Sequence, residues 1–311
     1  MDTPKWMVIA NPKAGKNKVL EQWPQIDAAL KGAGIDFEVI YSKHKYHSIE
    51  LAVKAIRNGF RNIIAVGGDG TIHEVVNGIF LQDTVSPEEI TVGVIPAGSG
   101  NDWVRMYGIP SDYKECAEII AKGEVVRQDI SRVEVLDSKV PNVRYIINGA
   151  GIGFDAQIAK DCNDLKIRGK SGPLVYVRAA VSSFFKIKAL NYRVYVDGEL
   201  FHQGKTLSVA LANGCYSGGG MIQAPDAVVD DGLINVTIIG KMSKPKILCK
   251  FKVLFSGEVY KVKEVKHTVG KEVLIEVDGE HPVETDGEII GTNPLKLNIM
   301  PNALKMIVKG K

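Results

Sequence analysis

The residues best suited to chemistry lie in a glycine-rich turn, Gly67-Gly68-Asp69-Gly70-Thr71, which follows a short β-branched run at 63–66. The run predicts a buried strand, and the amphipathic segment 71–81 predicts a helix. Bare backbone at a helix N-terminus binds anions, because free N–H groups and the helix dipole face the ligand. A carboxylate such as Asp69 is a poor neighbour for a phosphate unless a cation lies between them or a proton must move. The turn therefore predicts phosphoryl transfer on a nucleotide with Mg²⁺.

Two further loops follow predicted strands. Asn11-Pro12-Lys13-Ala14-Gly15 comes after 6–10, and Pro96-Ala97-Gly98-Ser99-Gly100-Asn101-Asp102 comes after 91–95. The first is too short for a Walker A loop; it suits phosphates, but is also compatible with an ordinary strand-to-helix turn. Asp69 and Asp102 each have the alternative role of helix N-cap. Because ligands sit at the carboxyl ends of parallel strands, three such loops favour an active site.

These loops must be positioned by an α/β domain. Strands predicted at 6–10, 37–41, 63–66 and 91–95 alternate with helices at 19–30, 49–60, 71–81 and 113–121. Such alternation predicts a Rossmann-like, three-layer domain with a parallel sheet. From about residue 128 the chain shows mostly strands with hairpin signals, such as Asp197-Gly198 between 192–196 and 199–201. The strands at 207–212, 233–239, 273–277 and 284–285 continue this region, and helices at 174–185 and 244–255 interrupt it.

We therefore expect an α/β nucleotide-binding domain at 1–128, with a C-terminal return at about 296–311, and a β-rich antiparallel sandwich domain at 129–295. The composition fits a globular protein, with 311 residues, 45% hydrophobic and 24% charged. The formal net charge of +3 is too weak for a dedicated nucleic-acid protein. The four cysteines form no C-x-x-C, so neither zinc nor a disulfide scaffold is indicated. No leader and no apolar run of ~18 residues is found, which predicts a cytoplasmic location.

The ordered set of motifs resembles the catalytic domain of the diacylglycerol kinase and sphingosine kinase superfamily, and most closely its soluble bacterial lipid kinases. The resemblance spans nearly the whole chain. It rests on the three loops and on later elements: Asn213-Gly214, Gly218-Gly219-Gly220, Ala224-Pro225-Asp226-Ala227, Asp230-Asp231-Gly232-Leu233 and Asp286-Gly287-Glu288. The Gly67 turn alone is shared with NAD kinases and, loosely, phosphofructokinases. The resemblance implies an α/β domain like theirs, a β-rich second domain and an active site in the cleft between them.

The resemblance also implies roles for individual residues. ATP would be held by Asn11, Pro12, Lys13, Ala14, Gly15, Ser42, Gly67, Gly68, Asp69, Gly70, Thr71, Glu74, Ser99 and Asn101. Ser99 stands where many members have Thr, which keeps the hydroxyl donor. Asp231 would bind Mg²⁺ with the carbonyls of Val228 and Leu233. This cation would be linked through water to Asp69 and Asp102, and Asp129 would join the network.

The catalytic residues implied are Glu288 as general base, Asp286 beside it, and Asp69. A primary alcohol is a weak nucleophile, so a carboxylate must accept its proton. Asp-Gly-Glu occurs twice, and the copy at 278–280 reads as a plain turn with a solvated Glu280. The copy at 286–288 is preferred, because Pro294 and Pro301-Asn302-Ala303-Leu304 follow it at a family-like distance.

Several alternatives stay open. Asn148-Gly149-Ala150-Gly151-Ile152-Gly153-Phe154-Asp155 resembles a dinucleotide fingerprint, but we interpret it as a strand that turns into a helix. The basic amphipathic segment 244–255 suits an anionic membrane or domain packing, and 174–185 suits either of these or an acyl-chain pocket. An NAD kinase and a catalytically silent regulator are the competing functions. The expected partner is a lipid reached at the inner membrane face, not nucleic acid. The identity of the lipid, the preference for ATP or GTP and the formation of a homodimer are left open.

Overall fold

The computed structural model describes residues 4–98, 100–136, 142–167, 182–183, 186 and 188–310. Ser99 and most of the helix expected at 174–185 lie outside the described residues. The chain divides into two compact units, Met1–Ile130 with Pro301–Lys311 and Ser131–Met300. No helix among the described residues is both long and apolar enough to cross a membrane.

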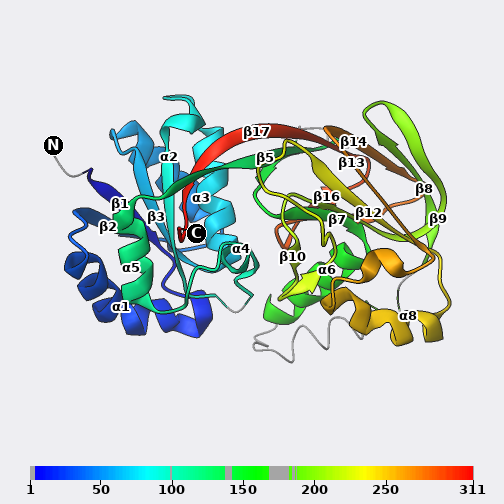
Figure 1. Cartoon of the computed structure of the whole chain (residues 1–311), viewed down its shortest axis with the longest axis horizontal. Coiled ribbons are helices and arrows are strands. Elements are labelled where there is room, and N and C mark those ends of the chain that lie inside the picture. The colour runs from blue at the N-terminus through cyan, green and yellow to red at the C-terminus, as the bar shows by residue number, and fades with distance from the viewer. Residues whose placement is uncertain are drawn as a thin grey trace. The chain divides into compact units, whose positions relative to one another are not determined.

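A parallel sheet forms the centre of the first unit (Figure 1). Its strands lie in the order β2-β1-β3-β4 followed by the end of β17, and every neighbouring pair is parallel. The strands are β1 (Trp6–Ala10), β2 (Phe37–Tyr41), β3 (Asn62–Gly67), β4 (Thr91–Pro96) and β17 (Leu295–Ile307). All five residues of β1 are buried, as expected for a strand covered on both faces.

Helices connect these strands: α1 (Ala14–Gly32), α2 (His47–Arg57), α3 (Asp69–Leu81), η1 (Pro87–Glu89), α4 (Asp102–Met106) and α5 (Tyr113–Lys122). The chain moves from β1 to β2 and then back across β1 to β3. Since such crossovers are right-handed, α1 lies on one face of the sheet, and α2 and α3 lie on the other. The α2–α3 packing is close, because a Cβ on Gly78 would stand 2.6 Å from the Cβ of Ala52.

The second unit is built from antiparallel strands (Figure 1). Strand β9 pairs with β7, β8 and β12; β15 joins β7 to β16, and β14 joins β8 to β17. The strands are β5 (Val125–Val135), β6 (Asn142–Ile146), β7 (Gly149–Gly153), β8 (Leu190–Val196), β9 (Glu199–Ala212), β10 (Tyr216–Ser217), β11 (Met221–Ile222), β12 (Ile234–Gly240), β13 (Val265–Gly270), β14 (Glu272–Val277), β15 (Pro282–Thr285) and β16 (Glu288–Thr292). The helices are α6 (Phe154–Ile167), α8 (Lys244–Lys250), η2 (Phe251–Phe255) and η3 (Val259–Lys261).

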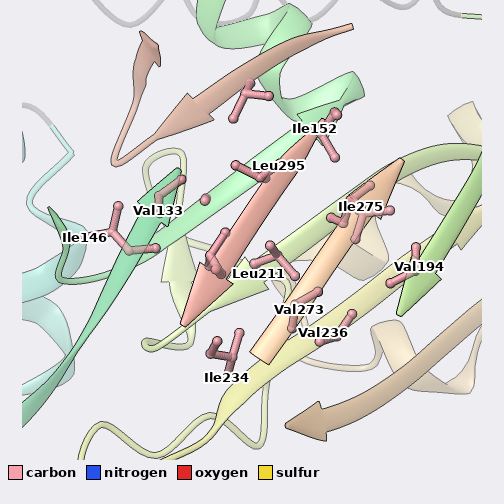
Figure 2. Packing of buried hydrophobic residues seen from close by; sticks show 14 of the residues in the cluster. Val133, Ile146, Ile152, Val194, Leu211, Ile234, Val236, Val273, Ile275 and Leu295 are labelled. Atoms are coloured by element: carbon pink, nitrogen blue, oxygen red, sulfur yellow. The ribbon is translucent and has the colours of Figure 1, made fainter. Parts of the chain in front are cut away.

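Alternate residues of these strands form the core of the second unit. Figure 2 shows Ile152 of β7, Leu211 of β9, Ile275 of β14 and Leu295 of β17 among its members, which come from strands far apart in the sequence. All four are buried. Burying branched apolar side chains of this kind contributes about 1.5–3 kcal/mol for each one. The core thereby fixes which side chains of β7 and β15 face outward.

The predicted parallel α/β unit, the antiparallel β-rich unit and the Asp197-Gly198 hairpin are confirmed. Segment 149–153 is a strand that leads into a helix, as interpreted. A merged strand and a divided helix differ from expectation. The strands expected at 199–201 and 207–212 are one strand, β9, because its first part pairs with β8 and its last part with β7 and β12. The helix expected at 244–255 is α8 followed by the 3₁₀ segment η2.

Candidate functional site

The three glycine loops of the first unit all follow the carboxyl ends of its strands. The strand order reverses at β1, which has β2 on one side and β3 on the other. Ligands of doubly wound sheets bind outside the strand ends at such a switch point. The loop that starts at Asn11 follows β1, and the loop that starts at Gly67 follows β3. These two loops therefore flank the place where the fold favours a ligand.

The first loop is held by the other two. The Asn11 side chain donates a hydrogen bond from Nδ2 to Oγ1 of Thr71, 3.3 Å away, and its Oδ1 accepts from the Lys13 backbone N–H at 3.1 Å. A Cβ on Gly15 would collide with the carbonyl oxygen of Ala97. Asn11 and Gly15 thus bring the β1 loop against the loops after β3 and β4. Pro12 and Ala14 take part as members of this loop.

The backbone of the first loop is strained. Gly15, Lys16 and Asn17 adopt left-handed conformations, with φ of 60°, 66° and 69°. A non-glycine residue there costs of order 1–3 kcal/mol, and such strain is concentrated at functional sites. Gly15 was predicted from the sequence as a phosphate-loop residue, whereas nothing in the local pattern marks Lys16 and Asn17 as left-handed.

Small residues let the second and third loops touch through their backbones. A Cβ on Gly68 would stand 2.9 Å from the Cα of Gly98, and a Cβ on Gly67 would collide with the Thr71 hydroxyl. Gly70 has open space around the position of a Cβ and belongs to the first turn of α3. The glycines at 67, 68 and 98 are therefore required by close approach, and the one at 70 is not.

The structure brings Asp69 and Asp102 together. A Cβ on Gly100 would stand 3.0 Å from Oδ2 of Asp69 and 3.7 Å from Oδ2 of Asp102. The other oxygen of Asp69 accepts a hydrogen bond from the backbone N–H of Trp103 at 3.2 Å. Both carboxylates therefore border the same small residue, beside the bare backbone of two glycine loops.

Asn101 shapes the third loop. It has a left-handed backbone with φ of 53°, and its side chain accepts from the Gly98 N–H at 3.1 Å and donates to the Gly98 carbonyl at 3.2 Å. These two hydrogen bonds hold Asn101 against Gly98. Ser99 itself lies outside the described residues.

Ser42 and Glu74 are linked to a neighbouring loop. Ser42 is buried directly after β2, and its N–H donates to the Ala10 carbonyl at the end of β1. Glu74 on α3 accepts two backbone hydrogen bonds, from Tyr46 at 2.9 Å and Ser48 at 3.1 Å. Both oxygens of Glu74 are thus used to hold the loop that follows Ser42.

Asp129 lies on β5, one residue before the end of the segment Met1–Ile130 of the first unit. Its Oδ1 accepts a hydrogen bond of 2.7 Å from the backbone N–H of Asn302, a residue with φ of 53°. Asp129 thereby joins β5 to β17. Beside it, Gln128 accepts from the Trp103 indole N–H at 2.8 Å and from the Tyr107 hydroxyl at 2.9 Å.

In the second unit, Asp286 is a hub of backbone hydrogen bonds. Its two carboxylate oxygens accept from the N–H groups of Ile147 and Asn148, both at 3.1 Å, and of Gly149 at 2.9 Å. Its own N–H donates to the Gly149 carbonyl, and its φ of 45° is left-handed. These contacts fix the turn between β15 and β16 against the start of β7. Glu288, half-buried, is the first residue of β16 after this turn.

Two family matches follow the division of the chain. Residues 5–133 match the diacylglycerol kinase catalytic domain, and residues 149–308 match the YegS C-terminal NAD kinase beta sandwich-like domain. The chain belongs to the lipid kinases built from these two domains. A diacylglycerol kinase of Mycobacterium tuberculosis is 26% identical over 304 residues, which cover 97% of this kinase and 94% of the relative.

Two solved structures share the fold of this kinase. A diacylglycerol kinase from Bacillus anthracis has a TM-score of 0.74 at 22% identity, covering 99% of this chain and 98% of that chain. An NAD kinase from Archaeoglobus fulgidus, solved in complex with ATP, has a TM-score of 0.52 at 14% identity, covering 97% and 93%. At these identities the likeness concerns the fold alone.

The loop predicted to bind metal is on the surface of the kinase's second unit. Asp231 is exposed, and its Oδ1 accepts from the Leu233 N–H at 2.9 Å across Gly232, whose φ is 73°. Val228 in the same loop is 47% exposed. No cluster of three or more His, Cys, Asp or Glu suited to a metal occurs among the described residues. One carboxylate with backbone carbonyls still fits Mg²⁺, which keeps several waters in protein sites.

The copy of Asp-Gly-Glu at 278–280 differs clearly from the copy at 286–288. Asp278, Gly279 and Glu280 are all exposed. Asp278 accepts a 3.3 Å hydrogen bond from Asn191 and lies 3.6 Å from Arg193. This copy is a surface turn of the kinase, whereas Asp286 and Glu288 are partly buried.

Sequence reasoning missed a pair of acids in the second unit, Asp155 and Glu284. Both lie against Gly151: a Cβ there would stand 3.0 Å from Oε1 of Glu284 and 3.3 Å from the Cβ of Asp155. Burial raises the pKa of Glu284 to about 8 and also raises the pKa of Asp155. The available signal was Asp155 itself, an acid two residues after a glycine-rich apolar strand.

An apolar pocket adjoins this acid pair. It is lined by Phe154, Leu207 and Ser208 and by Ile247, Phe251 and Leu254 of α8 and η2. Ser208 also donates a 2.7 Å hydrogen bond to Oδ2 of Asp155. The pocket therefore combines a hydrocarbon-like wall with one polar group beside a carboxylate.

Proposed function

We propose that this kinase transfers the γ-phosphate of ATP to a lipid hydroxyl, with diacylglycerol as the first candidate. One observation carries the proposal: three bare backbone loops lie at the strand ends of one sheet, and Asp69 and Asp102 border the same glycine of the third loop. Phosphoryl transfer is catalysed mainly by positioning and by neutralising charge. Bare N–H groups and the Thr71 hydroxyl supply phosphate contacts. Asp69 and Asp102 supply the negative charge that would hold a cation beside those phosphates.

Other first-unit residues complete the proposed nucleotide site. The loop Asn11, Pro12, Lys13, Ala14 and Gly15 supplies backbone donors and the Lys13 charge. Ser42, which directly follows β2, is proposed to contact the nucleotide. Glu74 supports the segment that follows Ser42, because its two oxygens accept hydrogen bonds from the backbone N–H groups of Tyr46 and Ser48. Asn101 clamps the loop that carries Ser99.

In the second unit, Glu288 is the proposed general base that takes the proton from the lipid hydroxyl. A positioned carboxylate contributes on the order of 10²–10⁴-fold to such a step. Asp286 is proposed to act through position, because its oxygens hold three backbone N–H groups of the segment at 147–149. The nucleotide loops belong to the first unit and the base to the second, so the reaction requires both units.

Asp231 is proposed to hold Mg²⁺ with the carbonyls of Val228 and Leu233. Mg²⁺ supplies charge neutralisation to the phosphates when bound. Asp231 already has one oxygen fixed by the Leu233 N–H, which orients the carboxylate toward solvent-accessible space. Asp69, Asp102 and Asp129 are proposed to connect to that ion through water.

The lipid substrate is proposed to reach the second unit from a membrane surface at the cytoplasmic side. The apolar pocket lined by Leu207, Ile247 and Leu254 would contact part of a hydrocarbon chain. Leu248 of α8 is 69% exposed, beside lysines such as Lys250. An exposed apolar residue within a basic segment suits anionic lipid.

The test is to incubate the kinase with γ-labelled ATP, Mg²⁺ and a panel of lipids in mixed micelles, with NAD in a parallel tube. Label in one lipid class supports the proposal and identifies the substrate. Label in NAD alone would establish the NAD kinase reaction instead, and label in no tube would favour a silent regulator.

A matched pair of variants tests the base. Glu288→Gln should lower kcat on the order of 10²–10⁴-fold while leaving nucleotide binding intact. Glu280→Gln, in the exposed copy of the same tripeptide, should keep wild-type activity. Full activity of Glu288→Gln would show that another group accepts the proton.

A further inference from the structure

The half-buried acids Asp155 and Glu284 come from elements distant in sequence. Asp155 is the second residue of α6, which follows β7, and Glu284 lies on β15, opposite Gly151 of β7 in the antiparallel ladder. Because residue 151 has no side chain, the Glu284 side chain can extend over β7 toward Asp155. The distances of 3.0 Å from Oε1 of Glu284 and 3.3 Å from the Cβ of Asp155 to a Cβ placed on Gly151 establish this arrangement.

The two acids have different hydrogen-bond partners. Asp155 accepts from the Ser208 hydroxyl at 2.7 Å and from the Gln223 amide at 2.9 Å. Glu284 accepts only a backbone hydrogen bond among those described for it, from the Gly287 N–H at 2.8 Å. Donors stabilise a carboxylate, so the negative charge belongs on Asp155 and the proton on Glu284.

The electrostatics agree with this assignment. Burial is the main cause of the raised pKa of Glu284, about 8, and the charges of Asp155 and Asp286 add to it, while the Gly287 N–H opposes it. Asp155 and Asp286 are the ionisable groups that act on Glu284. The strand β7, which pairs with β15, contributes only Gly149–Gly153 and carries no charge. At neutral pH Glu284, with its pKa of about 8, is therefore protonated.

The contact of Glu284 with Gly287 links the pair to the proposed base. Gly287 is the residue directly before Glu288 and has φ of 86°. Asp286 anchors the turn on one side through three backbone N–H groups, and Glu284 anchors it on the other through Gly287. The direction of the Glu288 side chain follows from the peptide plane between 287 and 288.

We propose that Glu284 is a positioning residue for the base Glu288, which it orients through the Gly287 N–H. The inference rests on the proposed function of Glu288. When Glu284 becomes charged at higher pH, desolvation and repulsion from Asp155 favour its movement away from β7, which loosens the turn. Loss of the Gly287 contact then lowers turnover without changing the ATP site.

Three variants test this proposal. Glu284→Ala removes the acceptor for Gly287 and should lower kcat by up to roughly 10²-fold, the cost of misplacing a catalytic group by about 1 Å. The KM for ATP should stay unchanged. Glu284→Gln keeps an acceptor without a charge and should recover most of the lost turnover. Glu280→Gln is the control for a surface Glu in the same segment.

The pH profile separates a positioning role from a merely structural one. Wild-type kcat should fall as the pH rises through about 8, whereas the Glu284→Gln profile should stay flat there. Equal profiles of the two proteins, or full turnover of a folded Glu284→Ala protein, would overturn the proposal. If Glu288→Gln is also fully active, the base assignment has failed first; if Glu288→Gln is inactive, the failure belongs to Glu284 alone.

Discussion

Gly98 lies against Gly68 so closely that a Cβ added to Gly98 would stand 2.5 Å from the Cα of Gly68. The same added atom would stand 2.6 Å from Oδ1 of Asn101, which accepts the Gly98 N–H. The loops after β3 and β4 are therefore packed backbone to backbone. Any side chain at position 98 must separate them or displace the Asn101 clamp.

Gly98→Ala is accordingly expected to destabilise the first unit by about 1–3 kcal/mol, the usual cost of overpacking, and to weaken ATP binding. Gly70→Ala is the stability control, since position 70 has open space and lies in α3. Thermal denaturation and nucleotide titration of both proteins check this. A Gly98→Ala protein that melts and binds ATP like wild type would disprove the close packing.

Asp286→Ala should destabilise the second unit strongly. The carboxylate accepts three backbone N–H groups, and a hydrogen bond to a charged group is worth about 1.5–3 kcal/mol. We expect a loss of about 3 kcal/mol or more in the free energy of unfolding, measured by denaturant titration. Asp278→Ala, in the exposed copy, should change it by less than about 0.5 kcal/mol. Equal losses in both variants would contradict the hub role of Asp286.

Glu74→Ala should affect the nucleotide and not the lipid. It removes the acceptor of the Tyr46 and Ser48 N–H groups, whose desolvation costs about 1–3 kcal/mol when unsatisfied. The loop after Ser42 would loosen, so the KM for ATP should rise while the KM for lipid stays constant. Glu50→Ala, at an exposed position in the first turn of α2, is the control. A change confined to the lipid KM would rule out this role.

Stability should depend on pH through Glu284. Its folded-state pKa of about 8 lies above the ordinary value of 4.5, so the folded protein keeps a proton that the unfolded chain releases between these values. Stability therefore falls as the pH rises through this window. Position 284 does not titrate in Glu284→Gln. The Tm of this variant minus the Tm of the wild type should therefore be more positive at about pH 8.5 than at about pH 5. A difference that is the same at both pH values would argue against a buried, protonated Glu284.

The adjacency of Asp69 and Asp102 was predictable because it follows from local patterns. Each residue comes directly after a β-branched strand and a glycine turn, and neighbouring parallel strands bring such turns to one edge. The pairing of Glu284 with Gly151 depends instead on antiparallel register between strands far apart in sequence. Glu74 likewise gains its partners through the packing of α3 on α2. No periodicity within either segment encodes such contacts.

Strands β5 and β17 each begin in one unit and end in the other, so the first unit is discontinuous in sequence while the second, Ser131–Met300, is continuous. Lys305 and Met306 pair with β4 and add a parallel strand to the first sheet. During synthesis, the ribosome therefore makes all of Ser131–Met300 before it makes this strand. The nucleotide-binding unit acquires its β4 neighbour only after the whole second unit has been synthesised.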